Sequence, residues 1–376
     1  MKVSVLTPDL SHNCLGRAHV LAELLERYYD VEIVGPKLRG DVWKPLQEEH
    51  EYKGIETSER IYDFTRKVPG LLSSISGDVI YASKPKVSSY GMGLLSVARD
   101  ERPLLLDVDD WESGFFYGAH GRFYTYAWAV PRLINANSFY YTRILERFST
   151  LADARTVSNH FLKEKFGGTV IPHVRDTDVF DPDRYDKVDA RKRFDLPEEE
   201  TLVMFSGTPR PHKGVDDLVR GVSSLNKEDV RVVVIGAHES PYTKELKRIG
   251  GDKLILRGQQ PFDQLPAWIA AADIIAIPQK DTSGTKGQLP AKVFDAMAMA
   301  KPIIATAVGD LPIVLDDSGK LVEPDSPAAI AAAIEELMEN PEKRITMGEA
   351  ARKRCVENYS FDAMAPKLKG IIEKAA

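Results

Sequence analysis

The sequence has few cysteines, few histidines and no excess of positive charge. Its two cysteines, Cys14 and Cys355, lie too far apart for a CxxC or zinc-ligand spacing, so we expect reduced packing residues and no disulfide framework. No histidine pair has the HxxxH or HxH spacing of a metal site, and we expect no bound metal. The formal net charge of −6 disfavours nucleic acid as a partner.

Long apolar runs are also missing. No stretch approaches the roughly 18 apolar residues that a spanning helix needs. Residues 1–8 contain a short apolar run that stops at Pro8, which predicts a first strand instead of an export signal. We therefore expect a soluble, cytoplasmic protein that can still sit peripherally on a membrane surface.

What is present is an alternation of short apolar runs and longer helical stretches within 376 residues. Near-continuous apolar strands separated by helices indicate parallel sheets that are covered on both faces. The sequence therefore predicts an α/β protein with two doubly wound, Rossmann-like domains. The strands are expected at residues 2–7, 31–35, 78–82, 104–108, 154–157, 169–171, 202–206, 231–235, 253–256, 273–277 and 302–305.

The boundary between the two domains is expected in a charged stretch that contains Pro172, Pro182 and Pro197. We expect the domains at 1–172 and 199–360, joined by a linker at 173–198. Helices are predicted at 328–339, 341–358 and 361–374. If the carboxyl edges of the two sheets face each other, a cleft between them is the expected site, which suits a transferase, an epimerase or a periplasmic-type binding protein.

Residues 206–214 follow a predicted strand and open a helix. Gly207 permits a tight turn, Gly214 lets the backbone approach a ligand, and the helix offers N–H groups and a positive dipole end. Lys213, with Arg210 as a second charge, makes this loop a candidate site for a diphosphate. The alternative is an ordinary loop with solvated basic residues.

A second loop leads into a helix that is expected to begin near Pro290. Asp295 lies about one turn inside that helix, on the same face as Ala291 or Lys292. A carboxylate there can accept hydrogen bonds from the two hydroxyl groups of a ribose. The alternative is an ion pair with a neighbouring lysine.

Five segments together resemble the motifs of the group 1 (family four) retaining glycosyltransferases of the GT-B fold. The family's G-R-L-x-x-x-K-G is similar to residues 207–214, and its P-x-K-x-x-E-x-M-A-x-G-K-P-V-V-A-T is similar to residues 290–306. Its G-G-x-P-E and S-G-L-L-V-x-P resemble residues 309–313 and 318–324, and its I-P-N-G-V-D-x-x-x-F-x-P resembles residues 171–182. The segments occur in the family's order and cover most of the chain.

The resemblance implies an enzyme that moves a hexose from a UDP- or GDP-linked sugar to the hydroxyl of a glycan or lipid-linked acceptor, with retention and without a cofactor. Lys213 would bind the diphosphate, Asp295 would contact the ribose, and a C-terminal helix over 361–376 would pack on the first domain. The residues with expected catalytic roles are Lys213, Asp109 and Asp110. The residues expected to bind the donor are Gly16, Gly207, Thr208, Arg210, Lys213, Gly287, Lys292, Asp295, Gly309, Asp310 and Leu311.

Three positions depart from the family pattern. Thr208 replaces an arginine, and Gly287 replaces the first member of an acidic pair that ends at Asp295. Asp109 or Asp110 stands closest to a family histidine, and a carboxylate can contact sugar hydroxyls but cannot donate as histidine does. A nucleotide-sugar 2-epimerase and a non-enzymatic nucleotide-sugar sensor stay as alternatives. A metal-binding DxD at Asp107 and Asp109 is a further one.

The segment 111–148 contains twelve of the chain's aromatic residues. Four arginines are interleaved with them, at positions 122, 132, 143 and 147. Aromatic rings with a polar tip suit a membrane interface, and arginines suit lipid phosphates. We therefore expect weak, reversible membrane contact and a lipid-linked acceptor; the alternative is that these rings pack a core.

Overall fold

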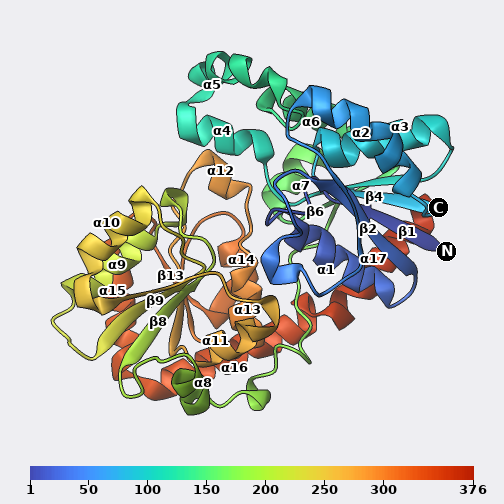
Figure 1. The fold of residues 1–376 in the computed structure, drawn as a ribbon. Coiled ribbons are helices and arrows are strands. Elements are labelled where there is room, and N and C mark those ends of the chain that lie inside the picture. The colour runs from blue at the N-terminus through green and yellow to red at the C-terminus, as the bar shows by residue number, and fades with distance from the viewer. The chain divides into compact units, whose positions relative to one another are not determined.

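The chain folds into two compact units. The computed structural model describes residues 1–376, apart from the side chains of His120 and Arg122. The first unit comprises Met1–His173, Lys286–Leu289 and Asp362–Ala376, and the second comprises Val174–Thr285 and Pro290–Phe361. Each unit holds one sheet of parallel strands with helices packed on it, so the predicted α/β class with two doubly wound domains is confirmed (Figure 1).

The sheet of the first unit has seven strands in the order β3-β2-β1-β4-β5-β6-β7. All its strand pairs are parallel, with Val5 of β1 opposite Ile33 on one side and Tyr81 on the other. Strands β4 and β5 are buried along their whole length, which explains their uninterrupted apolar sequences. The strands are β1 (Lys2–Leu6), β2 (Asp30–Lys37), β3 (Tyr52–Glu56), β4 (Val79–Ser83), β5 (Leu104–Val108), β6 (Ala154–Val157) and β7 (Thr169–Val170).

Helices cover both faces of this sheet. Phe64 and Leu71 of α2 and Met92 of α3 join a core with Ile80 and Leu106 of the sheet. Helix α1 packs on β1 and β2. The helices of this unit are α1 (Leu15–Glu26), α2 (Ile61–Ser74), α3 (Met92–Arg99), α4 (Glu112–His120), α5 (Arg122–Ala129), α6 (Phe139–Arg147), α7 (His160–Phe166) and, from Asp362 onward, α17 (Phe361–Ala375).

The sheet of the second unit has six parallel strands in the order β10-β9-β8-β11-β12-β13. Its strands β9 and β11 are rich in β-branched residues that are buried on both faces. The strands are β8 (Thr201–Ser206), β9 (Val230–Ile235), β10 (Leu254–Arg257), β11 (Ile274–Ile277), β12 (Ile303–Thr306) and β13 (Lys320–Val322).

Helices α9, α10 and α15 cover one side of the second sheet, and α11, α13 and α16 lie on the other (Figure 1). Leu218, Leu246 and Ile334 carry the first of these contacts. The helices of this unit are α8 (Lys187–Arg193), α9 (Val215–Ser224), α10 (Pro241–Gly250), α11 (Leu265–Ala270), α13 (Lys292–Ala298), α14 (Leu311–Leu315), α15 (Pro327–Glu339) and α16 (Pro341–Tyr359). The short α12 (Ser283–Lys286) lies where the sequence passes from one unit to the other.

The stretch expected to be a linker is part of the second unit from Val174 onward. It contains α8, whose Arg191 is buried, donates to the carbonyl of Ala271 and pairs with Asp273. At the other end of the chain, α17 packs on the first unit, where Lys367 donates to the carbonyl of Val170. The family resemblance implies this return of the last helix.

Candidate functional site

The loop after β8 has a positive φ angle at two glycines. Gly207 has a φ of +109° and Gly214, the N-cap of α9, has a φ of +64°. A Cβ atom on Gly214 would lie 1.8 Å from the carbonyl oxygen of Pro278, so no other residue fits there. The loop folds Lys213 back so that its Nζ donates to the carbonyl of Thr208 at 2.8 Å.

A second lysine reaches the same loop from another element. Lys292 begins α13, and its Nζ lies 3.8 Å from the ring centroid of Phe205 and 3.4 Å from where a Cβ on Gly207 would stand. Burial, and then the nearby charge of Lys213, hold the pKa of Lys292 well below its usual range, while Asp295 acts in the opposite direction. Two ammonium groups that disfavour each other's charge form a natural site for an anion.

The first turn of α9 does not offer the open N–H groups expected from the sequence. The amide of Asp216 donates to the hydroxyl of Tyr242, and that of Asp217 donates to the carbonyl of Gly214. The carboxylates of both aspartates pair with Lys280, at 3.3 and 3.1 Å. This expectation was wrong for these two amides, because the turn and its neighbours already satisfy them and two carboxylates already face the helix dipole.

The other predicted residues of the second unit lie on loops, except Leu311, which begins α14. Arg210 is exposed at the start of a 3-10 turn. Gly309 has a φ of +58°, Asp310 is the N-cap of α14, and the amide of Leu311 already donates to the carbonyl of Val308. Lys292 is a second basic side chain near the loop of Lys213, while the roles of Arg210 and of these loop residues remain predictions.

Asp295 lies in a buried ion pair. Its Oδ1 accepts from Nε of Arg175, whose guanidinium lies 5.6 and 5.7 Å from the ring centroids of Phe180 and Phe262. Burial raises the pKa of Asp295, and Arg175 and Lys292 oppose this effect. The expected ribose contact is not tested by this pairing, but one carboxylate oxygen is already engaged.

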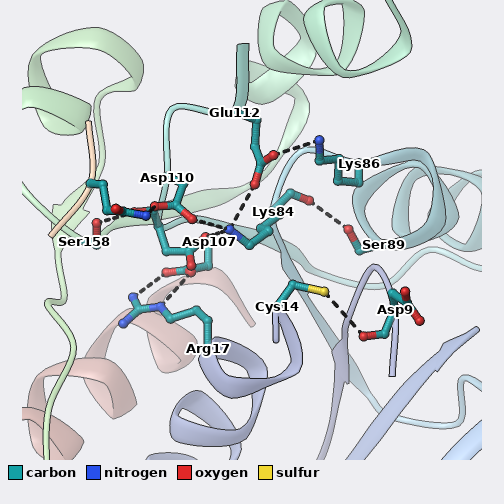
Figure 2. A network of polar contacts seen from close by, with 12 residues as sticks. Asp9, Cys14, Arg17, Lys84, Lys86, Ser89, Asp107, Asp110, Glu112 and Ser158 are labelled. Carbon is teal, nitrogen blue, oxygen red and sulfur yellow. Dashed lines mark hydrogen bonds and ion pairs between the residues drawn. The ribbon is translucent and has the colours of Figure 1, made fainter. Parts of the chain in front are cut away.

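In the first unit, a network of acidic and basic side chains gathers where β1, β4 and β5 end (Figure 2). Asp107 is fully buried, and Arg17 holds both of its oxygens, with Nε at 2.9 Å and Nη2 at 2.7 Å. Thr156 donates to the same carboxylate at 2.6 Å, and Arg17 also donates to the carbonyl groups of Ile171 and Pro172. The carboxylate of Asp107 is therefore a structural group, which weakens the DxD alternative.

Lys84 stands at the centre of the remaining carboxylates (Figure 2). Its Nζ lies 2.8 Å from Asp109, 2.7 Å from Asp110 and 2.9 Å from Glu112, and Lys86 holds the other oxygen of Glu112 at 2.8 Å. Burial alone would lower the pKa of Lys84, but the three carboxylates hold it well above its usual range. Burial raises the pKa of Asp109 against the opposing charge of Lys84.

Two predicted glycines of the first unit have different surroundings. A Cβ on Gly287 would lie 2.6 Å from Cβ of Trp111, whose amide donates to the carbonyl of Gly287. A glutamate of the family type therefore has no room at this position. A Cβ on Gly16 would make only an ordinary contact with Trp43, at 3.8 Å, so the space around Gly16 does not require a glycine.

Comparison with known proteins gives this geometry a context. Residues 200–340 match the profile of the family described as glycosyl transferases, group 1. Residues 200–340 belong to the group 1 glycosyl transferases. This match contains both loop glycines, Lys213, Lys292 and Asp295, and it confirms the family resemblance that the motifs suggested.

Two relatives of known name match part of the chain. A D-inositol 3-phosphate glycosyltransferase of Corynebacterium aurimucosum is 31% identical over 242 residues, which are 60% of this chain and 56% of the relative. A GDP-mannose-dependent alpha-(1-6)-phosphatidylinositol monomannoside mannosyltransferase of Mycobacterium tuberculosis is 28% identical over 244 residues, 60% of this chain and 63% of the relative. The chain thus matches somewhat more than half the length of these relatives.

The solved structure of Anabaena Alr3699/HepE in complex with UDP and glucose superposes on this chain with a TM-score of 0.77. The match covers 100% of both chains at 17% identity, so it shows the fold alone. Together with the two parallel sheets, it identifies the fold as GT-B.

Sequence reasoning missed three members of the polar networks described above. These residues are Lys84, Arg175 and Gln288. Each contacts an aspartate that is distant in sequence, and Gln288 donates to Asp110 at 3.1 Å. One signal was available for Arg175. It lies within the linker motif that we compared with the family pattern.

Proposed function

We propose that the chain is a retaining glycosyltransferase that transfers a hexosyl group from a UDP- or GDP-linked donor to an acceptor hydroxyl. The observation that carries this proposal is the convergence of Lys213 and Lys292 on the Gly207–Gly214 loop, inside the part of the chain that matches the group 1 family. The anion that fits a pair of ammonium groups in that family is the diphosphate of a nucleotide sugar.

The two lysines would act on the leaving group. As the bond from the anomeric carbon to the diphosphate breaks, negative charge grows on the phosphate oxygens, and fixed cations stabilise that charge without a metal ion. A charge-assisted hydrogen bond contributes about 1.5–3 kcal/mol. Only the part of this free energy by which the hydrogen bond is stronger in the transition state than in the bound donor increases the rate.

On the side of the first unit, Asp109 and Asp110 are proposed to accept hydrogen bonds from sugar hydroxyls. Lys84 keeps their carboxylates near each other despite their like charge. Neither residue can donate as the family histidine does while it is ionised. Their expected contribution is therefore orientation of the sugar, not protonation.

The acceptor is proposed to be the hydroxyl of a glycan or of a lipid-linked polyol. Two relatives carry names that specify inositol phosphate or phosphatidylinositol mannoside acceptors. Both names combine a ring hydroxyl with a phosphate, and we propose the same chemical class for this chain. We propose a cytoplasmic location for the protein. A lipid-linked acceptor would bring it beside a membrane for part of the time.

The test is an assay of the purified chain with UDP- and GDP-hexoses, alone and with inositol phosphate or an extracted lipid acceptor. Sugar transfer that needs the acceptor, persists in EDTA and keeps the donor's anomeric configuration by NMR supports the proposal. Lys213→Ala should nearly abolish turnover while the circular dichroism spectrum stays unchanged. Conversion of the donor alone to an epimer, or binding without turnover by any acceptor, would contradict the proposal.

A further inference from the structure

Helix α5 and the 3-10 turn that follows it, Val130–Ile134, turn apolar side chains toward solvent. Phe123 is 93% exposed, Tyr124 is 70% exposed and Ile134 is 59% exposed. Large apolar side chains that remain exposed as a group mark an interaction surface, whereas single ones need no explanation. We call the exposed residues Phe123, Tyr124, Val130, Leu133 and Ile134 the α5 surface.

The orientation of α5 is fixed by its buried side. Thr125 and Ala129 are fully buried and lie four residues apart, on one face of the helix. The hydroxyl of Thr125 donates to the carbonyl of Phe116 at 3.0 Å, which ties this face to α4. Phe123 and Tyr124 therefore point away from the unit, and Figure 1 shows α5 at the outer edge of its helices.

Helix α6 supports this element and carries a second exposed apolar row. The hydroxyl of Tyr140 donates to the carbonyl of Tyr126 at 2.8 Å, and α6 continues to the 3-10 turn Phe148–Leu151. The row consists of Ile144, Phe148 and Leu151, which are all exposed and recur at a helical spacing.

The exposed charge of this region has one sign. Between Trp111 and Leu151 the sequence has only two acidic residues, Glu112 and Glu146, and both are withdrawn from solvent. Glu112 pairs with lysines, as Figure 2 shows, and Glu146 accepts from the amide and hydroxyl of Ser113 at 3.0 and 2.7 Å.

Arginines remain on the outside. Arg132 and Arg147 are exposed, and the guanidinium carbon of Arg132 lies 3.4 Å from the ring centroid of Trp128. Nη1 of Arg132 donates to the carbonyl of Trp128 at 2.6 Å, which holds the guanidinium beside apolar surface, and Nε and Nη2 are the groups proposed to meet phosphate. A chain with a net charge of −6 thus presents a local surface that is apolar and cationic.

We propose that the α5 surface, with Arg132 and Arg147, is a membrane-docking surface that inserts apolar side chains among the head groups of an anionic phospholipid layer. Apolar side chains would enter the interface, and the two arginines would meet lipid phosphates. Within the part of the chain that the structure describes, no helix is long and apolar enough to cross a membrane, so this docking is peripheral. The lipid-linked acceptor rests on the proposed function, whereas the docking itself does not.

Flotation of the full chain with vesicles tests the proposal. Wild type should float with vesicles that contain phosphatidylglycerol in an equal share with phosphatidylcholine, less with phosphatidylcholine alone, and less at high salt. Phe123→Gln with Ile134→Gln should lower the vesicle partition coefficient about tenfold or more, through the loss of apolar insertion. Arg132→Gln with Arg147→Gln should lower binding to anionic vesicles only.

Two matched variants serve as controls. Ile313→Gln with Ile345→Gln removes two exposed apolar residues of the second unit, and Lys192→Gln with Lys353→Gln removes two exposed cations there. Both controls should float as wild type does. Unchanged thermal unfolding shows that each variant is folded.

Wild type that stays unbound to anionic vesicles at low salt would overturn the proposal. So would a dimer in light scattering that Phe123→Gln dissociates, because a second copy would then cover the surface. An assay of sugar transfer to a water-soluble acceptor, carried out with the α5 surface variants, tests the proposed glycosyltransferase activity separately from the proposed docking. If wild type floats with vesicles but transfers no sugar, the docking surface stands and the proposed activity is wrong. If wild type transfers sugar but does not float, the activity stands and the docking surface is wrong.

Discussion

Lys84 Nζ lies 2.8 Å from Oδ1 of Asp109, and both side chains are buried at the carboxyl end of the first sheet. Lys84 adopts a φ of +68°, which a residue with a side chain rarely does. Its amide donates to the carbonyl of Asp107 at 2.8 Å and its carbonyl accepts from Ser89, which together fix this conformation. A strained backbone that places one cation among three carboxylates is typical of a functional site.

Removal of this cation should make stability depend on pH. Lys84→Met leaves buried carboxylates without their partner, and we expect a loss of about 3–5 kcal/mol in the free energy of unfolding near neutral pH. Burial raises the pKa of Asp109, so the folded variant binds a proton there more readily than the unfolded chain does. Its unfolding free energy should therefore increase as the pH falls from about 8 to about 5.

Urea titrations of Lys84→Met across this pH range give the measurement. Lys84→Met with Asp109→Asn is the matched control, because it removes the carboxyl whose protonation is invoked. It should recover part of the stability and flatten the pH dependence. If Lys84→Met alone were as stable as wild type at every pH, the charge of Lys84 would not be needed for stability.

The Gly214 position should tolerate no side chain. Gly214→Ala places a Cβ 1.8 Å from the carbonyl of Pro278 at a positive φ, so we expect a loss of about 3 kcal/mol or more in the free energy of unfolding. Gly251 also has a positive φ, of +50°, but nothing lies within 4 Å of its Cβ direction. Gly251→Ala meets backbone strain alone, at φ +50° and ψ −131°, and should cost about 1–3 kcal/mol. Equal losses in denaturant titrations would mean that the contact with Pro278 relaxes freely.

The Arg175–Asp295 pair should show strong energetic coupling. Either Asp295→Ala or Arg175→Met leaves a buried charge unpaired, at a cost of about 3–5 kcal/mol, whereas the double variant should lose much less than the sum. A double-mutant cycle from urea unfolding measures this coupling. Additive losses would mean that the two charges do not interact in solution.

Asp295 should also discriminate between riboses. If its second carboxylate oxygen accepts from a ribose hydroxyl, wild type should bind UDP or GDP more tightly than the 2′-deoxy form, since a buried acceptor is otherwise left unsatisfied. Asp295→Ala should remove that preference. Calorimetric titration of UDP, GDP and their 2′-deoxy forms into both proteins measures this preference. If Asp295→Ala lost equal affinity for the ribo and deoxyribo ligands, Asp295 would be a structural residue.

Binding of a diphosphate should take up a proton at Lys292. Burial and Lys213 hold its pKa well below the usual range in the absence of an anion, and an anion beside the ammonium raises it. Affinity should therefore fall as the pH rises, because fewer molecules carry the charged form. Calorimetry in two buffers of different ionisation enthalpy measures the uptake, and Lys292→Met should abolish it. No proton uptake in wild type would place the anion elsewhere.

Much of the fold was predictable because the central strands are continuous apolar runs between helices. Strand β5 lies where the sequence predicts it, and the three last helices agree to within a residue or two. Strands β3 and β13 were missed. Strand β3 is an edge strand that is largely exposed and contains Gly54, and β13 has only three residues, so neither shows an apolar run.

The site was predictable only where one segment carries it. Lys213 and Lys292 each belong to a motif that can be read along the chain. The partners of the aspartates could not be found in this way. Lys84 meets Asp109 because β4 lies beside β5 in the sheet, and Arg175 meets Asp295 across 120 residues of sequence. Such pairings depend on topology, which a local pattern does not contain.

The central claim is that Lys213 and Lys292 form the diphosphate site of a nucleotide-sugar donor. Calorimetric titration of UDP and GDP into wild type, Lys213→Met, Lys292→Met and the exposed control Lys192→Met tests it most directly. We predict that one nucleotide binds wild type and the control equally, and that each site variant weakens binding by about tenfold to a hundredfold, as expected for the loss of a charge-assisted contact. Unchanged affinity in both site variants, with their thermal unfolding intact, would contradict the account.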